Sequence, residues 1–214
     1  FMKQNVSAGK VDYQGITNNK TQLKALVDEI ASFDLNSLKE GDEQKAFWIN
    51  TYNVLVIDGI VQEYPVASPM DIAGFFDRKK RRAANQSLTL NQIEHEKIRP
   101  VYNDARIHFV LVCAAIGCPS LIAEAYLPDS LNEQLERQTK ISLNMPLHAR
   151  IDKSAKTVFV TELFNWYKGD FLAEAESVIA YVNKYRDTDV PSDYKVDYTP
   201  YDWRLNDKNS VLLQ

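Results

Sequence analysis

The sequence predicts a single α+β domain in which several helices pack around a small mixed or antiparallel sheet. Its 214 residues are enough to bury a substantial core in one domain, and 45% of them are hydrophobic. Segments with helical spacing of apolar residues alternate with short hairpin patterns and do not repeat as β–α–β units. We therefore expect residues 1–214 to form one domain, with residues 1–39 as an N-terminal helical extension.

Charge and hydropathy argue against two classes of partner. The formal net charge is −4, whereas a nucleic-acid-binding domain usually carries a cationic surface. No apolar run approaches the roughly 18 residues that a membrane-spanning helix needs. The one cationic run, residues 78–82, is expected to form a solvated turn or hairpin strand, with an anion-binding rim as the alternative. The expected partners are a small molecule or peptide, and a protein as a further option.

Two amphipathic helices are predicted in the first third of the chain. Apolar residues recur at helical spacing in residues 21–33 and again in residues 42–64, where Asp42 is the expected cap. Asn53 lies in the middle of the second apolar stripe, and a buried amide costs about 1–3 kcal/mol if it is left unpaired. We therefore expect Asn53, and Asn50 near it, to make specific hydrogen bonds, either to hold a loop or to orient a ligand.

The stretch TLNQIEHEKIRP, residues 89–100, follows a predicted small hairpin and concentrates polar chemistry on a short helix. A Thr-x-x-Gln capping box begins this helix, and Pro100 is expected to end it. His95 and Arg99 lie four residues apart and so share one face, while Glu94 precedes His95. These side chains are candidates for proton transfer and for ligand binding.

Cys113 lies near the end of a run of β-branched and apolar residues, and Cys118 follows that run. Residues 105–115 predict a buried central strand, on which alternation places His108 and Cys113 on opposite faces. A proline follows Cys118, so residues 118–126 predict a helix with Cys118 at or beside its N-cap. The amide groups at a helix N-terminus stabilise a thiolate and can hold an oxyanion. Cys118 therefore has the position of a nucleophile, and Cys113, at the carboxyl end of the predicted strand, is a competing candidate or a small core residue.

The last third predicts helices, a hairpin and a terminal strand. Residues 130–143 are amphipathic, and the segments LHARID and TVFVT flank a turn as a hairpin on which His148 is expected to be exposed. The segments TELFNWYKGDFL and AESVIAYVNKYR predict the last helices. Alternation of Tyr201, Trp203 and Leu205 predicts a docked terminal strand that closes the site.

Five segments together resemble the DUF547 family of bacteria and plants, whose name denotes a domain of unknown function. In chain order they are AFWINTYNVLVIDGI, LTLNQIEHEKIRP, ARIHFVLVCAAIGCPSL, LFNWYKGDF and YDWRLN, within about residues 40–206. The resemblance implies that three blocks belong to the family's pattern: Trp48-Asn50-Asn53, Glu94-His95-Arg99 and His108 to Cys118. It places His148 in no family motif.

The resemblance also bears on location and partners. Plant relatives are discussed as interaction partners, and many bacterial relatives look secreted or periplasmic. We therefore expect a periplasmic or secreted bacterial protein, with a cytoplasmic one as the alternative. The chain begins Phe1-Met2, which fits either a chain from which a signal peptide has already been removed or a trimmed chain.

Three functions compete on this evidence. The first is a cysteine-dependent hydrolase or acyl transferase, in which Cys118 or Cys113 attacks a carbonyl and His95 moves the proton. Glu94, or an amide such as that of Asn53, orients the imidazole. The second is a non-catalytic binding module whose cysteines are structural or bridged. The third is a zinc site built from Cys113, Cys118 and one or both of His95 and His108.

The remaining expectations concern ligand contacts. No cofactor is expected, because the sequence lacks a phosphate loop, a dinucleotide fingerprint and an HExxH pair. Aromatic side chains belong to the core, or they form a wall for a carbohydrate or peptide if they gather around the cysteines; these are Trp48, Tyr52, Trp166, Tyr167, Tyr201 and Trp203. The residues expected to contact a substrate are Trp48, Asn50, Asn53, Arg99 and His108.

Overall fold

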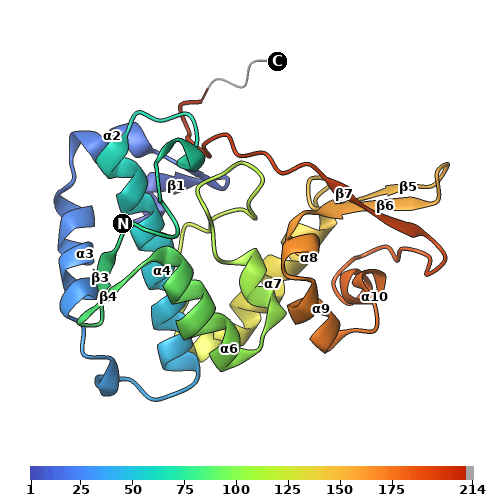
Figure 1. The fold of residues 1–214 in the computed structure, drawn as a ribbon, viewed down its shortest axis with the longest axis horizontal. Coiled ribbons are helices and arrows are strands. Elements are labelled where there is room, and N and C mark those ends of the chain that lie inside the picture. Colours follow the sequence, from blue (N-terminus) through green and yellow to red (C-terminus); the bar gives the residue numbers. More distant parts are fainter. Residues whose placement is uncertain (211–214) are drawn as a thin grey trace.

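A computed structural model describes residues 1–210, so the last four residues of the predicted domain lie outside the described part. Helices dominate and the strands form three small sheets, which confirms the α+β class (Figure 1). The helices are α1 (Met2–Asn5), α2 (Tyr13–Asn18), α3 (Thr21–Ser32), α4 (Asp42–Glu63), α5 (Leu90–Gln92), α6 (Arg99–Tyr102), α7 (Leu131–Asn144), α8 (Leu163–Trp166), α9 (Lys168–Glu174) and α10 (Val178–Asn183). Within the described residues, none of these helices is long and apolar enough to cross a membrane.

The three sheets are two hairpins and one mixed sheet. Strands β1 (Val6–Ser7) and β2 (Lys10–Val11) pair antiparallel, as do β3 (Arg81–Ala83) and β4 (Gln86–Leu88). Strand β6 (Thr157–Thr161) pairs antiparallel with β5 (Ala149–Asp152) and parallel with β7 (Lys195–Thr199). The hairpin predicted before residue 89 is confirmed as β3–β4, and the one predicted from LHARID and TVFVT is confirmed as β5–β6. The cationic run supplies β3, where Arg81 is partly buried and packs against the Phe75 ring instead of facing solvent.

Helix α4 is the central element of the larger apolar core. It carries apolar side chains around most of its circumference, and α3 packs along it as the periodicity predicts (Figure 1). The expected cap is wrong by one position, because Gly41 is the N-cap and Asp42 is the first helical residue. Gly41 has φ +92°, a conformation that a side chain at Cβ disfavours. Asp42 instead places its carboxylate in the first turn, where the helix dipole favours it.

Two segments around the cysteines differ from the prediction. Residues 105–115 are not a strand: a 3₁₀ helix (Ala105–Phe109) leads into a loop whose backbone is held by Asn53. Residues 118–126 are not a helix, because tertiary contacts take their backbone groups. Asn50 pairs with both backbone groups of Tyr126, and Gln138 donates to the carbonyl of Ser120. Single side-chain amides thus replace regular secondary structure in this region.

The polar helix after β4 continues further than predicted. Thr89 and Gln92 form the expected capping box, but Ile93–Ile98 is a π-helical turn that leads directly into α6. Pro100 does not end the helix, since it occupies the first turn of α6, where no backbone N–H is required.

The C-terminal tail crosses the cysteine loop without forming the predicted strand at residues 201–205. The regular strand is β7, which precedes this segment, and Leu205 makes only an isolated bridge to Ala115. Backbone hydrogen bonds from Ile116 to Arg204 and from Gly117 to Asp202 then fix the tail on the loop. A Cβ at Gly117 would lie 2.9 Å from the Asp202 nitrogen, so only glycine permits this close approach.

His148 is buried, in contrast to the predicted exposed position. Its side chain belongs to the turn between α7 and β5, and only 1% of the residue is exposed. Within residues 1–210 neither ring nitrogen has a hydrogen-bond partner. Burial lowers the pKa of His148 to about 4, so the ring is neutral at physiological pH.

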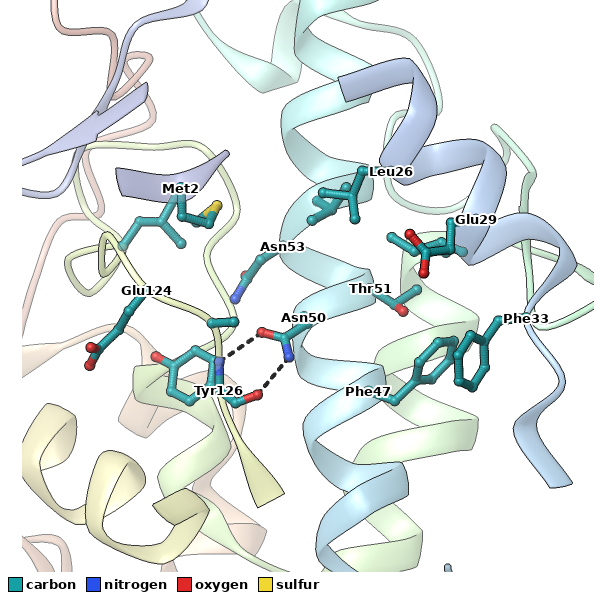
Figure 2. Close-up of a pocket in the computed structure, with 14 residues that line it drawn as sticks. Met2, Leu26, Glu29, Phe33, Phe47, Asn50, Thr51, Asn53, Glu124 and Tyr126 are labelled. Carbon is teal, nitrogen blue, oxygen red and sulfur yellow. Dashed lines mark hydrogen bonds between the residues drawn. The ribbon is translucent and has the colours of Figure 1, made fainter. Parts of the chain in front are cut away.

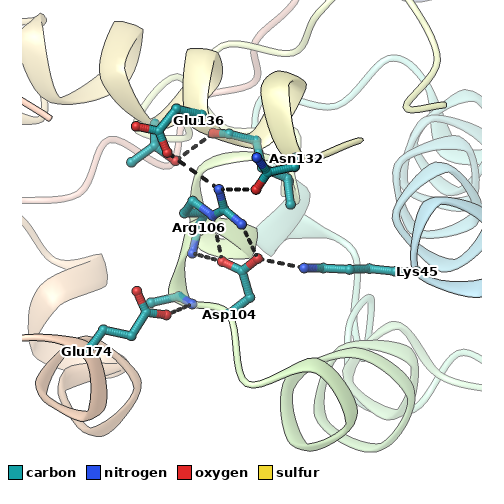
Figure 3. A network of polar contacts seen from close by, with 9 residues as sticks. Lys45, Asp104, Arg106, Asn132, Glu136 and Glu174 are labelled. Atoms are coloured by element: carbon teal, nitrogen blue, oxygen red, sulfur yellow. Dashed lines mark hydrogen bonds and ion pairs between the residues drawn. The ribbon is translucent and has the colours of Figure 1, made fainter. Parts of the chain in front are cut away.

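A partly buried ion network connects α4, α7 and α9 to residues 104–106, which precede the cysteine segment (Figure 3). Lys45 of α4 donates to Asp104 at 2.6 Å, and Arg106 donates to the same carboxylate. Arg106 also contacts Glu136 of α7, while Glu174 of α9 accepts from the backbone nitrogen of Ala105 at 2.6 Å. The network therefore fixes the start of the segment that leads to His108 and Cys113.

Candidate functional site

A crevice of about 290 Å³ lies where the central helix, the polar π turn, α8 and the C-terminal tail meet. Glu94, His108 and Cys113 contribute to its lining, so the structure brings together members of the second and third polar blocks, while no residue of the Trp48-Asn50-Asn53 block reaches it. Aromatic side chains from four separate segments form a large part of the wall: Tyr52, Phe76, Trp166, Tyr167, Tyr201 and Trp203. The aromatic residues therefore gather around the cysteine segment, which is the arrangement expected if they form a wall for a ligand.

Glu94 is the carboxylate of this crevice. Only 6% of the residue is exposed, and no ion pair joins it to a cation anywhere in the described chain. Tyr52, Tyr167 and Tyr201 surround it, and the pKa of each phenol is raised, first by burial and then by the negative charge of Glu94. Burying an unpaired carboxylate is costly, and the π-helical turn that turns Glu94 inward is a geometry often associated with functional sites.

His95 follows Glu94 but lies outside the crevice. It is exposed, and Nη1 of Arg99 donates to its Nδ1 at 2.8 Å. The predicted i,i+4 pairing of these two side chains is therefore present. The structure does not bring His95 to either cysteine, so the proton-transfer role expected for it has no geometric support.

His108 is held by a carboxylate that the sequence analysis did not select. Its Nε2 donates to Oδ2 of Asp170 at 2.8 Å, and Arg99 binds both oxygens of the same carboxylate at 2.8 and 3.0 Å. The hydrogen bond from His108 and then those from Arg99 hold the pKa of Asp170 well below its usual range. The Tyr167 ring stacks on His108 with 3.9 Å between ring centroids, and the Arg99 guanidinium carbon lies 4.7 Å from the same ring centroid. These contacts fix the histidine in one orientation.

Asp170 lies within the segment LFNWYKGDF, which was predicted to be helical and to belong to the family pattern, with no site role. An acidic residue one helical turn after an aromatic pair was the available signal, but nothing in the sequence pairs it with residues 99 and 108. The pairing depends on α9 packing beside the 3₁₀ helix, a contact between segments some 60 residues apart.

Cys113 and Cys118 form a disulfide, with 6.3 Å between their Cα atoms. Cys113 is partly exposed in the crevice, whereas Cys118 is buried beneath the loop. The hydroxyl of Tyr201 lies 3.2 Å from each sulfur, and the backbone nitrogen of Cys113 donates to Sγ of Cys118 at 3.0 Å. While the bridge is intact, neither sulfur is a thiolate, so neither can act as the expected nucleophile.

The remaining predicted contacts lie away from the crevice. Trp48 is buried within the α4 core. Asn53 bonds the carbonyl of Val110 and the nitrogen of Val112, each at 2.9 Å, and so shapes the cysteine loop from behind. Both backbone bonds of Asn50 are visible in Figure 2, beside a separate, largely apolar cavity of about 260 Å³. These asparagines position loops, and a direct contact with substrate stays a prediction.

The zinc hypothesis lacks a ligand set in the described structure. Residues 1–210 contain no group of three or more His, Cys, Asp or Glu side chains arranged to hold a metal ion. The two sulfurs are bonded to each other, and the two histidines of the proposed set bind Arg99 and Asp170.

Comparison with known proteins gives one match. The model of a family described as "Protein of unknown function, DUF547" matches residues 35–141, which include all three polar blocks. The resembling segments in α8, α9 and the tail lie beyond the matched range. No curated protein and no solved structure matches the chain.

Proposed function

The chain belongs to the DUF547 family, whose description assigns no activity, and we propose from its crevice that it is a binding module for a cationic group on an apolar body, such as an arginine or lysine side chain of a peptide. The observation that supports this proposal is the buried Glu94 carboxylate, which faces an aromatic crevice without a cation of its own.

Charge complementarity favours a cationic ligand over a neutral one. Arg99 lies on the same helical segment and feels the charge of Glu94, but its guanidinium donates to both oxygens of Asp170. Glu94 shares a hydrogen bond with Tyr167 but has no ion-pair partner among the described residues, so the fold does not neutralise its charge. A ligand cation placed beside it offsets the desolvation that burial imposed on the carboxylate.

The aromatic wall fits the same ligand. Trp166 is 46% exposed and stacks on Trp203 with 5.9 Å between ring centroids, and Tyr201 packs against both. Ring faces attract cations by about 0.5–2 kcal/mol, and guanidinium groups stack on them most often. Because Tyr167 already stacks on His108 and lies beside Arg99, we expect the ligand cation to contact the rings of the two tryptophans and Tyr201.

Fluorescence titration tests the proposal directly, since two of the chain's three tryptophans line the crevice. The probes are a blocked tripeptide with a central arginine, the same peptide with neutral citrulline, and a glucose tetramer. We expect the arginine peptide to bind most tightly and the Glu94→Gln variant to lose roughly 30-fold or more in affinity, the cost of removing one partner of a buried charged pair. Glu96→Gln, two residues away and exposed, is the matched control.

Each alternative result has a definite meaning. Equal affinity for the arginine and citrulline peptides would contradict a role for charge. Tighter binding of the glucose tetramer would replace the cationic ligand with a saccharide, for which the same ring faces provide stacking surfaces.

A second candidate keeps the cysteine-dependent hydrolase or acyl transferase, with His108 in place of His95. The specific observation is that Cys113 and His108 line the same crevice while Asp170 orients the imidazole from behind. Reduction of the bridge would give a thiol, a base and an orienting carboxylate in one site. Reduced protein should then be acylated at Cys113 by an activated ester, and His108→Ala should slow this step by about 100-fold or more. An unchanged rate in the variant would exclude this role.

The bridge also supports the proposed periplasmic or secreted location, because disulfides persist in oxidising compartments. Alkylation of free thiols in acid-quenched cells should leave most copies of the cysteine pair unlabelled. Labelling of all copies in untreated cells would contradict that location.

A further inference from the structure

The two sulfurs of the bridge differ in access. Cys113 is partly exposed and lines the crevice, whereas Cys118 is 5% exposed and lies beneath the loop. A reagent that enters the crevice therefore meets only one of the two sulfur atoms. Thiol–disulfide exchange depends on which sulfur is attacked and on how readily the other one leaves.

The buried sulfur is prepared to leave as a thiolate. Sγ of Cys118 accepts a hydrogen bond from the backbone nitrogen of Cys113 at 3.0 Å and another from the Tyr201 hydroxyl at 3.2 Å. Hydrogen bonds to an ionised acceptor are stronger than those to a neutral one, so both bonds strengthen as negative charge develops. A better stabilised thiolate is a faster leaving group.

The C-terminal tail holds one of these two donors, the Tyr201 hydroxyl, in place. Tyr201 belongs to the segment that Gly117 allows to approach the loop, and its ring packs against Trp166 and Trp203. Its hydroxyl also lies 3.2 Å from Sγ of Cys113. The Tyr201 hydroxyl thus contacts both sulfurs of the disulfide bond that exchange would break.

We propose that this crevice is a thiol–disulfide exchange site for an external dithiol. A thiolate of the dithiol attacks Sγ of Cys113, a mixed disulfide forms, and the bond to Cys118 breaks to leave the Cys118 thiolate beneath the loop. The second thiolate of the dithiol then attacks the sulfur of its own chain, which releases Cys113. Two electrons pass to the protein: the dithiol becomes a disulfide, and Cys113 and Cys118 become thiols after uptake of protons from water.

The inference does not depend on the identity of the crevice ligand, and oxidised protein is sufficient for the binding titration above. Failure of exchange would therefore leave the cation-binding proposal intact. A failed titration would likewise leave the exchange chemistry open to its own test.

Two single-cysteine variants test the order of attack with the neutral reagent 2,2′-dithiodipyridine. In Cys118→Ser the free thiol is Cys113, and we expect it to react in the folded protein. In Cys113→Ser the free thiol is Cys118, and we expect a reaction at least about 100-fold slower, because it requires local opening of the loop. Equal rates, or a faster Cys118, would overturn the proposal.

The wild-type protein gives an independent readout that needs no cysteine substitution. Reaction with the monothiol glutathione at neutral pH, quenched by acid and mapped by mass spectrometry, should trap the mixed disulfide on Cys113, because no second thiolate releases it. Tyr201→Phe should slow reduction by about tenfold, the loss expected for one hydrogen bond to a charged group, whereas Tyr198→Phe in β7 should not. An adduct on Cys118, or a bridge that is reduced only when the protein unfolds, would refute the exchange site.

Discussion

His148 gives the sharpest prediction for stability, because a buried imidazole without partners makes the fold sensitive to acid. Burial lowers its pKa from 6.5 to about 4. Below pH 6.5 the unfolded chain takes up a proton that the folded chain does not, so the free energy of unfolding falls as the pH falls. Each pKa unit corresponds to about 1.4 kcal/mol, which gives a loss of about 3 kcal/mol between pH 7 and pH 4.

The assay is urea unfolding followed by tryptophan fluorescence at about pH 7, 5 and 4. Carboxylates also titrate in this range, so the informative quantity is the difference between wild type and His148→Leu at each pH. We expect the variant to match or exceed wild type at pH 7, since it removes two unpartnered ring nitrogens, and to gain about 3 kcal/mol on wild type by pH 4. His95→Leu, an exposed histidine, is the control. A pH-independent difference would refute the buried neutral imidazole.

Two further predictions concern the polar groups that shape the loop around the site. Asp104→Asn should destabilise the protein by about 3–5 kcal/mol in urea unfolding at pH 7, because Lys45 is left buried without its partner. Although burial alone would raise the pKa of Asp104, Arg106 and Lys45 together lower it to about 2, so wild-type stability from this group should be lost as the pH falls from about 4 towards 2. Asn53→Leu should cost at least about 2 kcal/mol and loosen the cysteine loop, measurable as faster amide exchange at Val112. Unchanged exchange there would contradict the loop-holding role.

The sequence predicted the elements whose information is local. The periodicity of α3, α4 and α7, the capping box at Thr89 and both hairpins follow from residues within one element, and all are present. The buried amide of Asn53 was also predicted to need partners, because burial and hydrogen-bonding demand can both be read from an apolar stripe. Its two backbone partners lie almost 60 residues away and could not be named.

The errors share a physical cause. Contacts between distant segments take the backbone hydrogen bonds that the local sequence would otherwise use for regular secondary structure. Residues 105–115 have the composition of a buried strand, yet Asp104 caps a 3₁₀ turn there and Asn53 takes the backbone groups that a neighbouring strand would use. The alternation argument that separated His108 from Cys113 therefore failed, and both line one crevice. Similarly, the charge of Asp170 could be seen in the sequence, but its position beside His108 depends on how α9 packs.

The binding affinity and the stability of Glu94→Gln, measured on the same sample, test the central claim most directly. A carboxylate that serves only the fold would lower stability when it is neutralised. A carboxylate buried for ligand binding costs stability, so its replacement by an amide of the same size should leave the urea midpoint equal or higher while affinity for the arginine peptide falls roughly 30-fold or more. A variant that loses stability and still binds the peptide would contradict the assignment of the crevice as a cation-binding site.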